Sequence, residues 1–320
     1  MKGKIFTSIF AQEIENYLDY KVSFGCIRGS FYCHLKNFDR FCNSHQMSLP
    51  VFSREHADEW IKRLKNEATT THYSRVNAIK HFLGYISKKE YDVFITRDIA
   101  FKKTLFQPHI YSNDEIRRYF TAVDTFNSVQ NKKNNIQYPI LFRLLYCCGT
   151  RINETLGIRK QDIDLDDGII KLSETKNNRE RYIVLNNGLC SLMKQFTEKC
   201  FYLLNEDDYI FTSSNGKRCS GKTIYEHHRL ILKKAGIPFI GNGEGPRIHD
   251  WRDTFAVNSF KQLVDAGNDL YVSLPILSTY LGHKTIYATE RYLRLTMSIF
   301  PYIEKKFKDK INQVFGEGDL

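Results

Sequence analysis

The sequence predicts a mainly α-helical protein with one small antiparallel β-sheet. Apolar residues recur every three to four positions along most of the 320 residues, a spacing typical of amphipathic helices. Only around residues 163–185 does the period shorten to that of strands. Apolar residues make up 42% of the chain, which is enough for a sizeable core. We find no internal repeat and no low-complexity segment, so repeat architectures are excluded.

Residues 9–88 predict four helices. The first opens near Ile14, and the others are expected at 31–42, 57–64 and 71–88, each with an apolar stripe at helical spacing. The polar side of the fourth helix carries Asn77, Lys80, His81 and Lys88. Lys80 is therefore a candidate contact for a phosphate, although an ordinary solvated face would show the same pattern.

We predict a helical domain at residues 1–100, a linker at 101–111 and a second domain at 112–320. The helical period is lost towards the end of the first stretch, and the linker contains Gln107-Pro108. Ser112 and Glu115 form a capping box, a pair that satisfies free N–H groups where a helix begins. Further helical segments are predicted at 115–126, 138–148, 188–203, 221–235, 247–265 and 274–310.

The second domain contains the only strand pattern. Ile163-Asp164-Leu165 and Ile169–Leu172 flank an Asp-Gly pair, which predicts a hairpin with its turn at Gly168. A third strand is expected at Arg181–Leu185. The polar connection before it, Glu174–Glu180, contains Lys176.

The overall charge favours a polyanionic partner. The formal net charge is +11 and the pI is about 9.1, values common among nucleic-acid-binding proteins. Eight cysteines lack CxxC or His-paired metal spacing, and acidic residues interrupt the first apolar stretch too early for a secretory signal. No run approaches the roughly 18 apolar residues of a membrane span. We therefore expect reduced thiols and a cytoplasmic location, with no membrane partner.

Several residues have chemistry suited to a phosphate. Arg151 and Arg252 can each grip phosphate oxygens with two N–H donors and neutralise charge during a phosphoryl transfer. His249 precedes Arg252 by three residues, so the two share a helix face, and histidine readily moves a proton near neutral pH. Taken singly, each of these residues is more often an ordinary surface or packing residue.

Further candidates lie in the polar connection and near the C-terminal end. Lys176 has a primary amine that can protonate a leaving oxygen, but a solvated loop lysine is the commoner case. His283 follows a Leu281-Gly282 turn, and Tyr292 lies on a helix expected from Tyr287 to Thr296. A phenol becomes a useful nucleophile when positive charges and a base assist it.

The ordered set of arginine, lysine, His-x-x-Arg, Leu-Gly-His and tyrosine resembles the tyrosine recombinase (phage integrase) family. The resemblance covers residues 112–295 and is most specific in HDWRDTFA (249–256) and LGHKTIYATERY (281–292). It assigns the six catalytic positions to Arg151, Lys176, His249, Arg252, His283 and Tyr292. Glu154 takes the acidic position that supports the first arginine. The nine-residue step from His283 selects Tyr292 over Tyr287.

Two features depart from the simplest pattern. Lys171 lies close to Lys176 in the sequence, so it is an alternative for the lysine position. The interval between His249 and His283 is somewhat long, and residues 265–274 are expected to form an inserted loop. The first domain is similar to the family's core-binding domain, with the likeness carried by residues 77–89.

The resemblance implies a DNA recombinase that cleaves duplex DNA through a 3′-phosphotyrosyl bond, without ATP, metal or another cofactor. No carboxylate cluster suited to two Mg²⁺ ions is present. The implied assembly is a homotetramer on DNA, with the C-terminal segment 298–315 exchanged between subunits; a helix packed on its own domain is the alternative. A mobile-element role and an accessory directionality factor are also expected. Additional candidate phosphate contacts are Arg218 and Lys222, beside a helix that Ser220 could cap.

Two other functions share much of this pattern. A type IB topoisomerase uses the same tyrosine chemistry but relaxes supercoils instead of exchanging strands. A catalytically inactive, integrase-like DNA-binding regulator would retain the fold without cleaving DNA. Since all six catalytic positions hold competent residues, we prefer the active recombinase.

Overall fold

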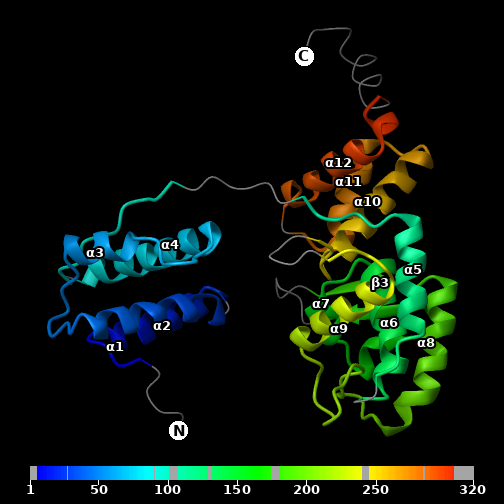
Figure 1. Ribbon diagram of the computed structural model, residues 1–320, viewed down its shortest axis with the longest axis horizontal. Helices are drawn as coiled ribbons and strands as arrows, with labels where there is room; N and C mark the ends of the chain where they lie inside the picture. Colours follow the sequence, from blue (N-terminus) through cyan, green and yellow to red (C-terminus); the bar gives the residue numbers. More distant parts are fainter. Residues whose placement is uncertain are drawn as a thin grey trace. The chain divides into compact units, whose positions relative to one another are not determined.

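The computed structural model describes residues 6–26, 28–89, 91–100, 107–128, 131–173, 180–239, 245–283 and 285–305. The chain divides into two compact units, Met1–Phe106 and Gln107–Leu320, which are described separately below (Figure 1). The boundary falls within the stretch predicted to be a linker. The predicted fold class, mainly helical with a small antiparallel sheet, is confirmed.

The first unit is built from helices around an aromatic core. They are α1 (Ala11–Ser23), α2 (Gly29–Ser44), α3 (Arg54–Ile61) and α4 (Thr69–Ile86), followed by the short 3₁₀ helix η1 (Ser87–Lys89). The core centres on Phe38, whose ring packs against those of Phe52, Trp60 and Phe82. Helix α3 begins earlier than predicted because Ser53 caps it, its hydroxyl accepting a hydrogen bond from the His56 backbone N–H.

One arginine is buried in this unit. Arg75, 3% exposed, donates from Nε and Nη2 to the carboxylate of Glu67 at 2.8 and 2.9 Å. Its Nη1 and Nη2 also reach the backbone carbonyls of Trp60 and Lys62. A buried guanidinium is stable in this setting because a carboxylate neutralises it and carbonyls accept its remaining hydrogens.

The second unit begins with helices and the predicted sheet. Its first elements are α5 (Asn113–Asp124), α6 (Asn134–Cys147), α7 (Ile152–Leu156), η2 (Lys160–Asp162), β1 (Ile163–Asp164), β2 (Ile169–Leu172) and β3 (Arg181–Val184). The capping box is confirmed: the Ser112 hydroxyl accepts from the Glu115 N–H, and the Glu115 carboxylate accepts from the Ser112 N–H. The sheet has the order β1-β2-β3 and is antiparallel throughout, with Ile170 opposite both Ile163 and Ile183.

The remaining elements complete this unit. They are α8 (Asn187–Cys200), η3 (Phe201–Leu203), α9 (Gly221–Lys234), α10 (Asp250–Asp265), α11 (Leu270–Leu281) and α12 (Tyr287–Ile299). Helices α10, α11 and α12 pack together (orange to red in Figure 1) around Phe260, Leu277 and Leu281. Among the described residues, no helix is both long and apolar enough to cross a lipid bilayer.

The prediction of an inserted loop at residues 265–274 is wrong. Helix α10 continues to Asp265, and α11 already begins at Leu270, so only four residues connect them. The early start follows from the backbone, because the carbonyl of Asp269 accepts hydrogen bonds from both the N–H and the hydroxyl of Ser273. Gly267, with φ of +84°, makes the tight turn between the helices.

Candidate active site

The first part of the site is the start of α7. Arg151 precedes this helix in an extended conformation, and Glu154 lies in its first turn. The Glu154 carboxylate, 3% exposed, accepts the Arg151 backbone N–H at 2.9 Å and the Arg151 Nη1 at 2.6 Å. One carboxylate therefore fixes both the main chain and the side chain of Arg151. Glu154 thus holds Arg151 in place.

Glu154 also binds a second arginine, Arg181, which the sequence did not indicate. Arg181, at the start of β3, donates from Nη1 and Nη2 to the Glu154 Oε2, both at 3.0 Å. Its Nε donates to the backbone carbonyl of Tyr280 in α11 at 3.1 Å. Burial is the main reason that the pKa of Arg181 is lowered, and Glu154 opposes that effect.

The first turn of α10 contributes Arg252, which is 1% exposed. Its Nη1 donates to the carbonyl of Gly149 at 2.6 Å, and its Nη2 donates to the carbonyl of Leu281. Gly149 is required there, because it has φ of +59° and a Cβ would lie 2.3 Å from the Phe255 ring. Burial, and then the charge of Arg151, lower the pKa of Arg252 to about 10.

The end of α11 determines where His283 lies. The N–H of Gly282 bonds to the carbonyl of Thr279, and the N–H of His283 bonds to that of Ser278, which is the Schellman arrangement. Gly282 has φ of +64°, as this helix end requires. The next two carbonyls at this helix end are capped by arginine side chains. Arg181 donates a hydrogen bond to the carbonyl of Tyr280, and Arg252 donates one to the carbonyl of Leu281. The Leu-Gly-His sequence is thus a helix terminus held by two arginines.

The imidazole of His283 lies between Arg252 and α12. Its Nε2 is 3.2 Å from the Arg252 Nη2, and its Nδ1 is 2.7 Å from the Thr289 hydroxyl. Because arginine can only donate, Nε2 is the acceptor and Nδ1 carries the hydrogen. Burial first, then Arg252 and Arg151, lower the pKa of His283 to about 4. The ring is therefore neutral near pH 7.

Tyr292 lies on α12, and its side chain packs beside His283 and Arg252. It is 2% exposed, and its ring stacks on that of His283 with centroids 5.9 Å apart. Burial first, then the carboxylate of Asp253, raise the pKa of Tyr292 to about 12, against the opposing charges of Arg252 and Arg291. Tyr287 on the same helix is 78% exposed and is not among these contacts.

Asp253 links α10 to α12. This fully buried carboxylate accepts from the Arg291 Nη2 at 2.7 Å, and Arg291 in turn lies over the Tyr292 ring at 5.3 Å. Asp253 also influences His249, which precedes α10 and whose ring reaches the surface. Partial desolvation and the neighbouring arginines lower the pKa of His249, while Asp253 opposes them. His249 is consequently a neutral base near pH 7.

The rest of HDWRDTFA fixes the position of α10 in the unit. Asp250, fully buried, accepts the N–H of Arg247 and that of His109. Trp251 stacks on Tyr111 with centroids 3.8 Å apart and planes 2° from parallel. The hydroxyl of Thr254 accepts the N–H of Tyr111. Asp250, Trp251 and Thr254 are therefore structural, and they anchor the helix that carries Arg252.

The structure brings together Arg151, Arg252, His283 and Tyr292, with His249 at the surface beside them. Their guanidiniums are positively charged, and the balancing carboxylates nearby are Glu154 and Asp253. Such an arrangement can hold an anion with two or more negative oxygens next to a phenol. In the described part of the chain there is no group of three or more side chains able to hold a metal ion.

Other predicted site residues have different surroundings. Lys176 lies outside the described residues. Lys171, its alternative, forms an ion pair with Glu180 at 2.9 Å. Arg218 donates to the carbonyl of Asn153 at 2.6 Å, which places it beside α7.

The proposed phosphate contacts on the helix surfaces are ion-paired. Lys80 pairs with Asp98 at 2.6 Å in the first unit, and Lys222 lies 3.9 Å from Glu226. Ser220 does cap α9, because its hydroxyl accepts from the N–H of Thr223. The side chains of Lys80 and Lys222 are 30% and 86% exposed, and ion pairs of such lysines contribute little to stability.

Sequence reasoning missed Arg181, Asp253, Arg291 and Thr289. Asp253, Thr289 and Arg291 lie inside the two sequence boxes quoted above (249–256 and 281–292), so the charged and hydroxyl side chains of those boxes were the signal that could have found them. Arg181 had no such signal, since an arginine at the start of a strand is common. Its role comes from contacts with residues 27 and 99 positions away.

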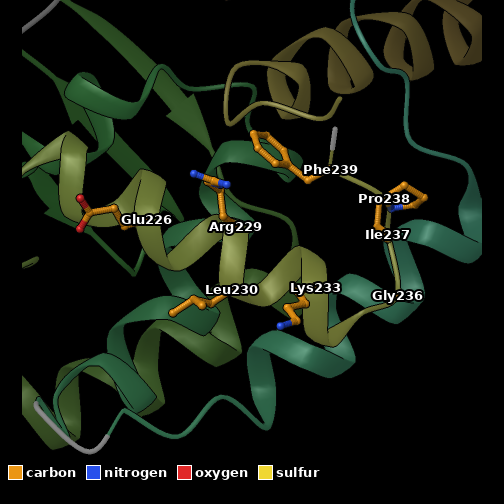
Figure 2. A pocket seen from close by; sticks show the side chains of 8 residues that line it. All are labelled: Glu226, Arg229, Leu230, Lys233, Gly236, Ile237, Pro238 and Phe239. Carbon is orange, nitrogen blue, oxygen red and sulfur yellow. The ribbon is translucent and has the colours of Figure 1, made fainter. Parts of the chain in front are cut away.

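A separate hollow of about 610 Å³ lies beside the C-terminal half of α9 (Figure 2). It is lined by Glu226, Arg229, Leu230, Lys233, Gly236, Ile237, Pro238 and Phe239. The guanidinium of Arg229 lies 4.4 Å from the centre of the Phe239 ring at its rim. None of the predicted catalytic residues lines this hollow, so the arginine cluster and not this hollow defines the candidate site.

Comparisons with known proteins show the family to which the chain belongs. Residues 111–298 match the model of the phage integrase family. A tyrosine recombinase of Pseudothermotoga lettingae is 24% identical over 294 residues, covering 89% of this chain and 90% of the relative. The tyrosine recombinase XerC of Staphylococcus saprophyticus is 23% identical, with 83% and 86% covered. The fold is similar to that of the site-specific recombinase XerH in its pre-cleavage complex with difH substrate: TM-score 0.64, 18% identity, 86% and 79% covered.

Proposed function

Since this chain belongs to the phage integrase family, the tyrosine recombinases, we propose that it cleaves and rejoins duplex DNA at specific sites through a 3′-phosphotyrosyl intermediate. The observation that carries the proposal is the surroundings of Arg252. This buried guanidinium has two carbonyls and one histidine as its hydrogen-bond partners among the described residues. A buried cation without its own carboxylate is costly, and an anionic phosphate would compensate it.

Arg151, Arg252 and His283 would hold the scissile phosphate. The two guanidiniums neutralise the charge that develops on the non-bridging oxygens as phosphorus becomes pentacoordinate. A bound phosphate would also raise the pKa of His283 from its low value, because a negative charge favours the protonated ring. The imidazole could then donate a hydrogen bond to a phosphate oxygen.

Tyr292 would be the nucleophile. Its phenolic oxygen forms a bond to phosphorus while the bond from phosphorus to the 5′-oxygen breaks. The phenolic proton passes to His249, whose lowered pKa keeps the ring neutral and able to accept it. Lys176 would donate a proton to the departing 5′-oxygen. Attack by the 5′-hydroxyl of another strand reverses these steps and releases Tyr292, so no ATP is consumed.

Several broader features belong to the same proposal. Exchange between two DNA duplexes needs four active sites, so we propose a homotetramer on DNA. Segment 298–315 would pass between subunits, an accessory factor would set directionality, and the biological setting would be a mobile element in a cytoplasm. The first unit would bind DNA with the polar side of α4, including Lys80.

Covalent capture tests this function. The protein is incubated in EDTA with nicked duplexes drawn from the DNA that flanks its own gene, and a detergent-resistant protein–DNA adduct is sought. We expect an adduct with the native protein and none with Tyr292→Phe. Tyr287→Phe is the matched control, since it removes the same hydroxyl from an exposed position of the same helix.

The outcomes separate the alternatives. An adduct that persists in Tyr292→Phe would contradict the choice of nucleophile. Salt-sensitive binding without an adduct on any fragment would favour the inactive DNA-binding regulator. Relaxation of supercoiled DNA that lacks a defined site would favour the topoisomerase.

A further inference from the structure

Arg181 lies at the start of β3 and connects two helix ends that adjoin proposed catalytic residues. Through Glu154 it contacts the start of α7, where Arg151 lies. Through the Tyr280 carbonyl it contacts the end of α11, two residues before Gly282-His283. It also opens β3, five residues after Lys176 in the chain. A single guanidinium, on a side chain that is 11% exposed, thus bonds the start of α7 to the end of α11.

The hydrogen bonds of Arg181 depend on the planar, branched shape of its guanidinium. Nη1 and Nη2 form a fork on one carboxylate oxygen while Nε points to a carbonyl on the other side. A lysine ammonium is a point donor on a flexible stem and cannot span both partners in this way. The packing is tight as well, because a Cβ on Gly282 would lie 3.1 Å from the Arg181 Cδ.

We propose that Arg181 is a positioning residue for DNA cleavage, which holds the Glu154–Arg151 pair in fixed register with the turn that carries His283. This inference rests on the proposed function and adds a residue to it. Arg181 does not touch the phosphate in this assignment. It acts through Arg151, which must lie opposite His283 and Arg252 for the three to grip one phosphate.

Arg181→Lys tests the proposal on two nicked duplexes. One has an ordinary scissile phosphodiester, and the other has a methylphosphonate, which is uncharged because a methyl group replaces one non-bridging oxygen. We expect adduct formation on the phosphodiester to slow by about 10- to 100-fold, the effect of misplacing a catalytic group by about an ångström. On the methylphosphonate we expect a loss of less than about threefold, since the misplaced charge matters less there.

Arg143→Lys is the matched control. Arg143 also combines a two-pronged carboxylate contact, to Asp124, with a bond to a backbone carbonyl, but it lies on α6 outside the site. We expect equal adduct rates to those of the native protein on both duplexes. A loss of general stability would slow both duplexes alike, and so would weaker DNA binding.

A second comparison reaches the same interaction from its other partner, Glu154, and its single variant leaves Arg181 unchanged. Glu154→Gln should give the same substrate dependence, and adding Arg181→Lys to it should slow cleavage little further, because both changes remove one coupled interaction. Equal slowing on the two duplexes, additive effects of the two variants, or an Arg181→Lys rate equal to the native rate would each overturn the positioning role. If the native protein forms no adduct on either duplex, the proposed function itself fails and this inference fails with it.

Discussion

The two units each bury an arginine, and the difference between them separates a structural arginine from a functional one. Arg75 in the first unit and Arg252 in the second are equally inaccessible, at 3% and 1% exposure. Arg75 is neutralised by the carboxylate of Glu67, whose pKa it lowers through their hydrogen bonds. The partners of Arg252 are the carbonyls of Gly149 and Leu281 and the ring of His283.

The physical consequence is a difference in local charge. A guanidinium bonded to a carboxylate adds little to the electrostatic potential around it, whereas one bonded to neutral groups leaves its charge uncompensated. Burial and the charge of Arg151 accordingly lower the pKa of Arg252 to about 10. The second unit therefore maintains an unfavourable concentration of positive charge, which is what a site for an anion requires.

The largest expected effect compares Arg252→Met with Arg75→Met. Loss of Arg252 should slow covalent adduct formation by about 10³-fold, the magnitude found when a donor to developing negative charge is removed. Loss of Arg75 should instead lower the free energy of unfolding of the first unit by ~3–5 kcal/mol, since it leaves Glu67 buried and unpaired. Single-turnover cleavage and hydrogen exchange of each unit measure the two quantities.

The comparison would be broken by either of two results. If Arg252→Met destabilises its unit as strongly as Arg75→Met destabilises the other, Arg252 is mainly structural. If Arg75→Met slows cleavage as much as Arg252→Met at a temperature where both are folded, Arg75 belongs to the functional machinery.

Much of this site could be predicted from the sequence because phosphate chemistry requires particular side chains. Arg151, Arg252, His283 and Tyr292 were predicted as a group from residue type and order, and the structure brings these four together. The capping box at Ser112 and the Asp-Gly hairpin were equally accessible, since both depend on local hydrogen bonds and turn geometry. The covalent capture experiment tests the chemical role of the nucleophile in this group, Tyr292.

What could not be predicted depends on contacts between distant residues. Arg181 has its partners on α7 and α11, and no local pattern indicates either of them. The start of α11 at Leu270 was missed because it depends on the bonds between Asp269 and Ser273, in a stretch whose polar residues are typical of a loop. The surroundings of Arg252 likewise depend on the fold, since Gly149 is 103 residues away.

Asp253→Asn tests how the charges around Arg252 affect the proposed nucleophile, Tyr292. The carboxylate of Asp253 helps to raise the pKa of Tyr292, so removing its charge should lower that pKa, within the span between about 12 and the ordinary value of 10.0. Cleavage depends on loss of the phenolic proton, and the rising alkaline limb of its pH profile should therefore move to lower pH.

Single-turnover adduct formation between pH 7 and pH 10 measures this shift. Glu290→Gln is the control, because it removes a carboxylate from the same helix as Tyr292 at a site where Glu290 pairs with Arg294 on the surface. A limb that stays in place in Asp253→Asn, or moves equally in both variants, would mean that Asp253 does not set the acidity of the phenol.

The smallest effect concerns inorganic phosphate, the simplest anion that the cluster could hold. A ligand at ten times its dissociation constant stabilises the folded state by about 1.4 kcal/mol, which for a unit of this size raises the melting temperature by roughly 3–6 °C. The chain has two tryptophans, so the fluorescence of Trp60→Phe reports Trp251 in the second unit. Phosphate should raise the melting temperature above that in chloride at equal ionic strength, and Arg252→Met should remove the difference. Equal stabilisation with and without Arg252 would indicate the general exclusion of phosphate from protein surfaces, and the uncompensated charge of Arg252 would then not be an anion site.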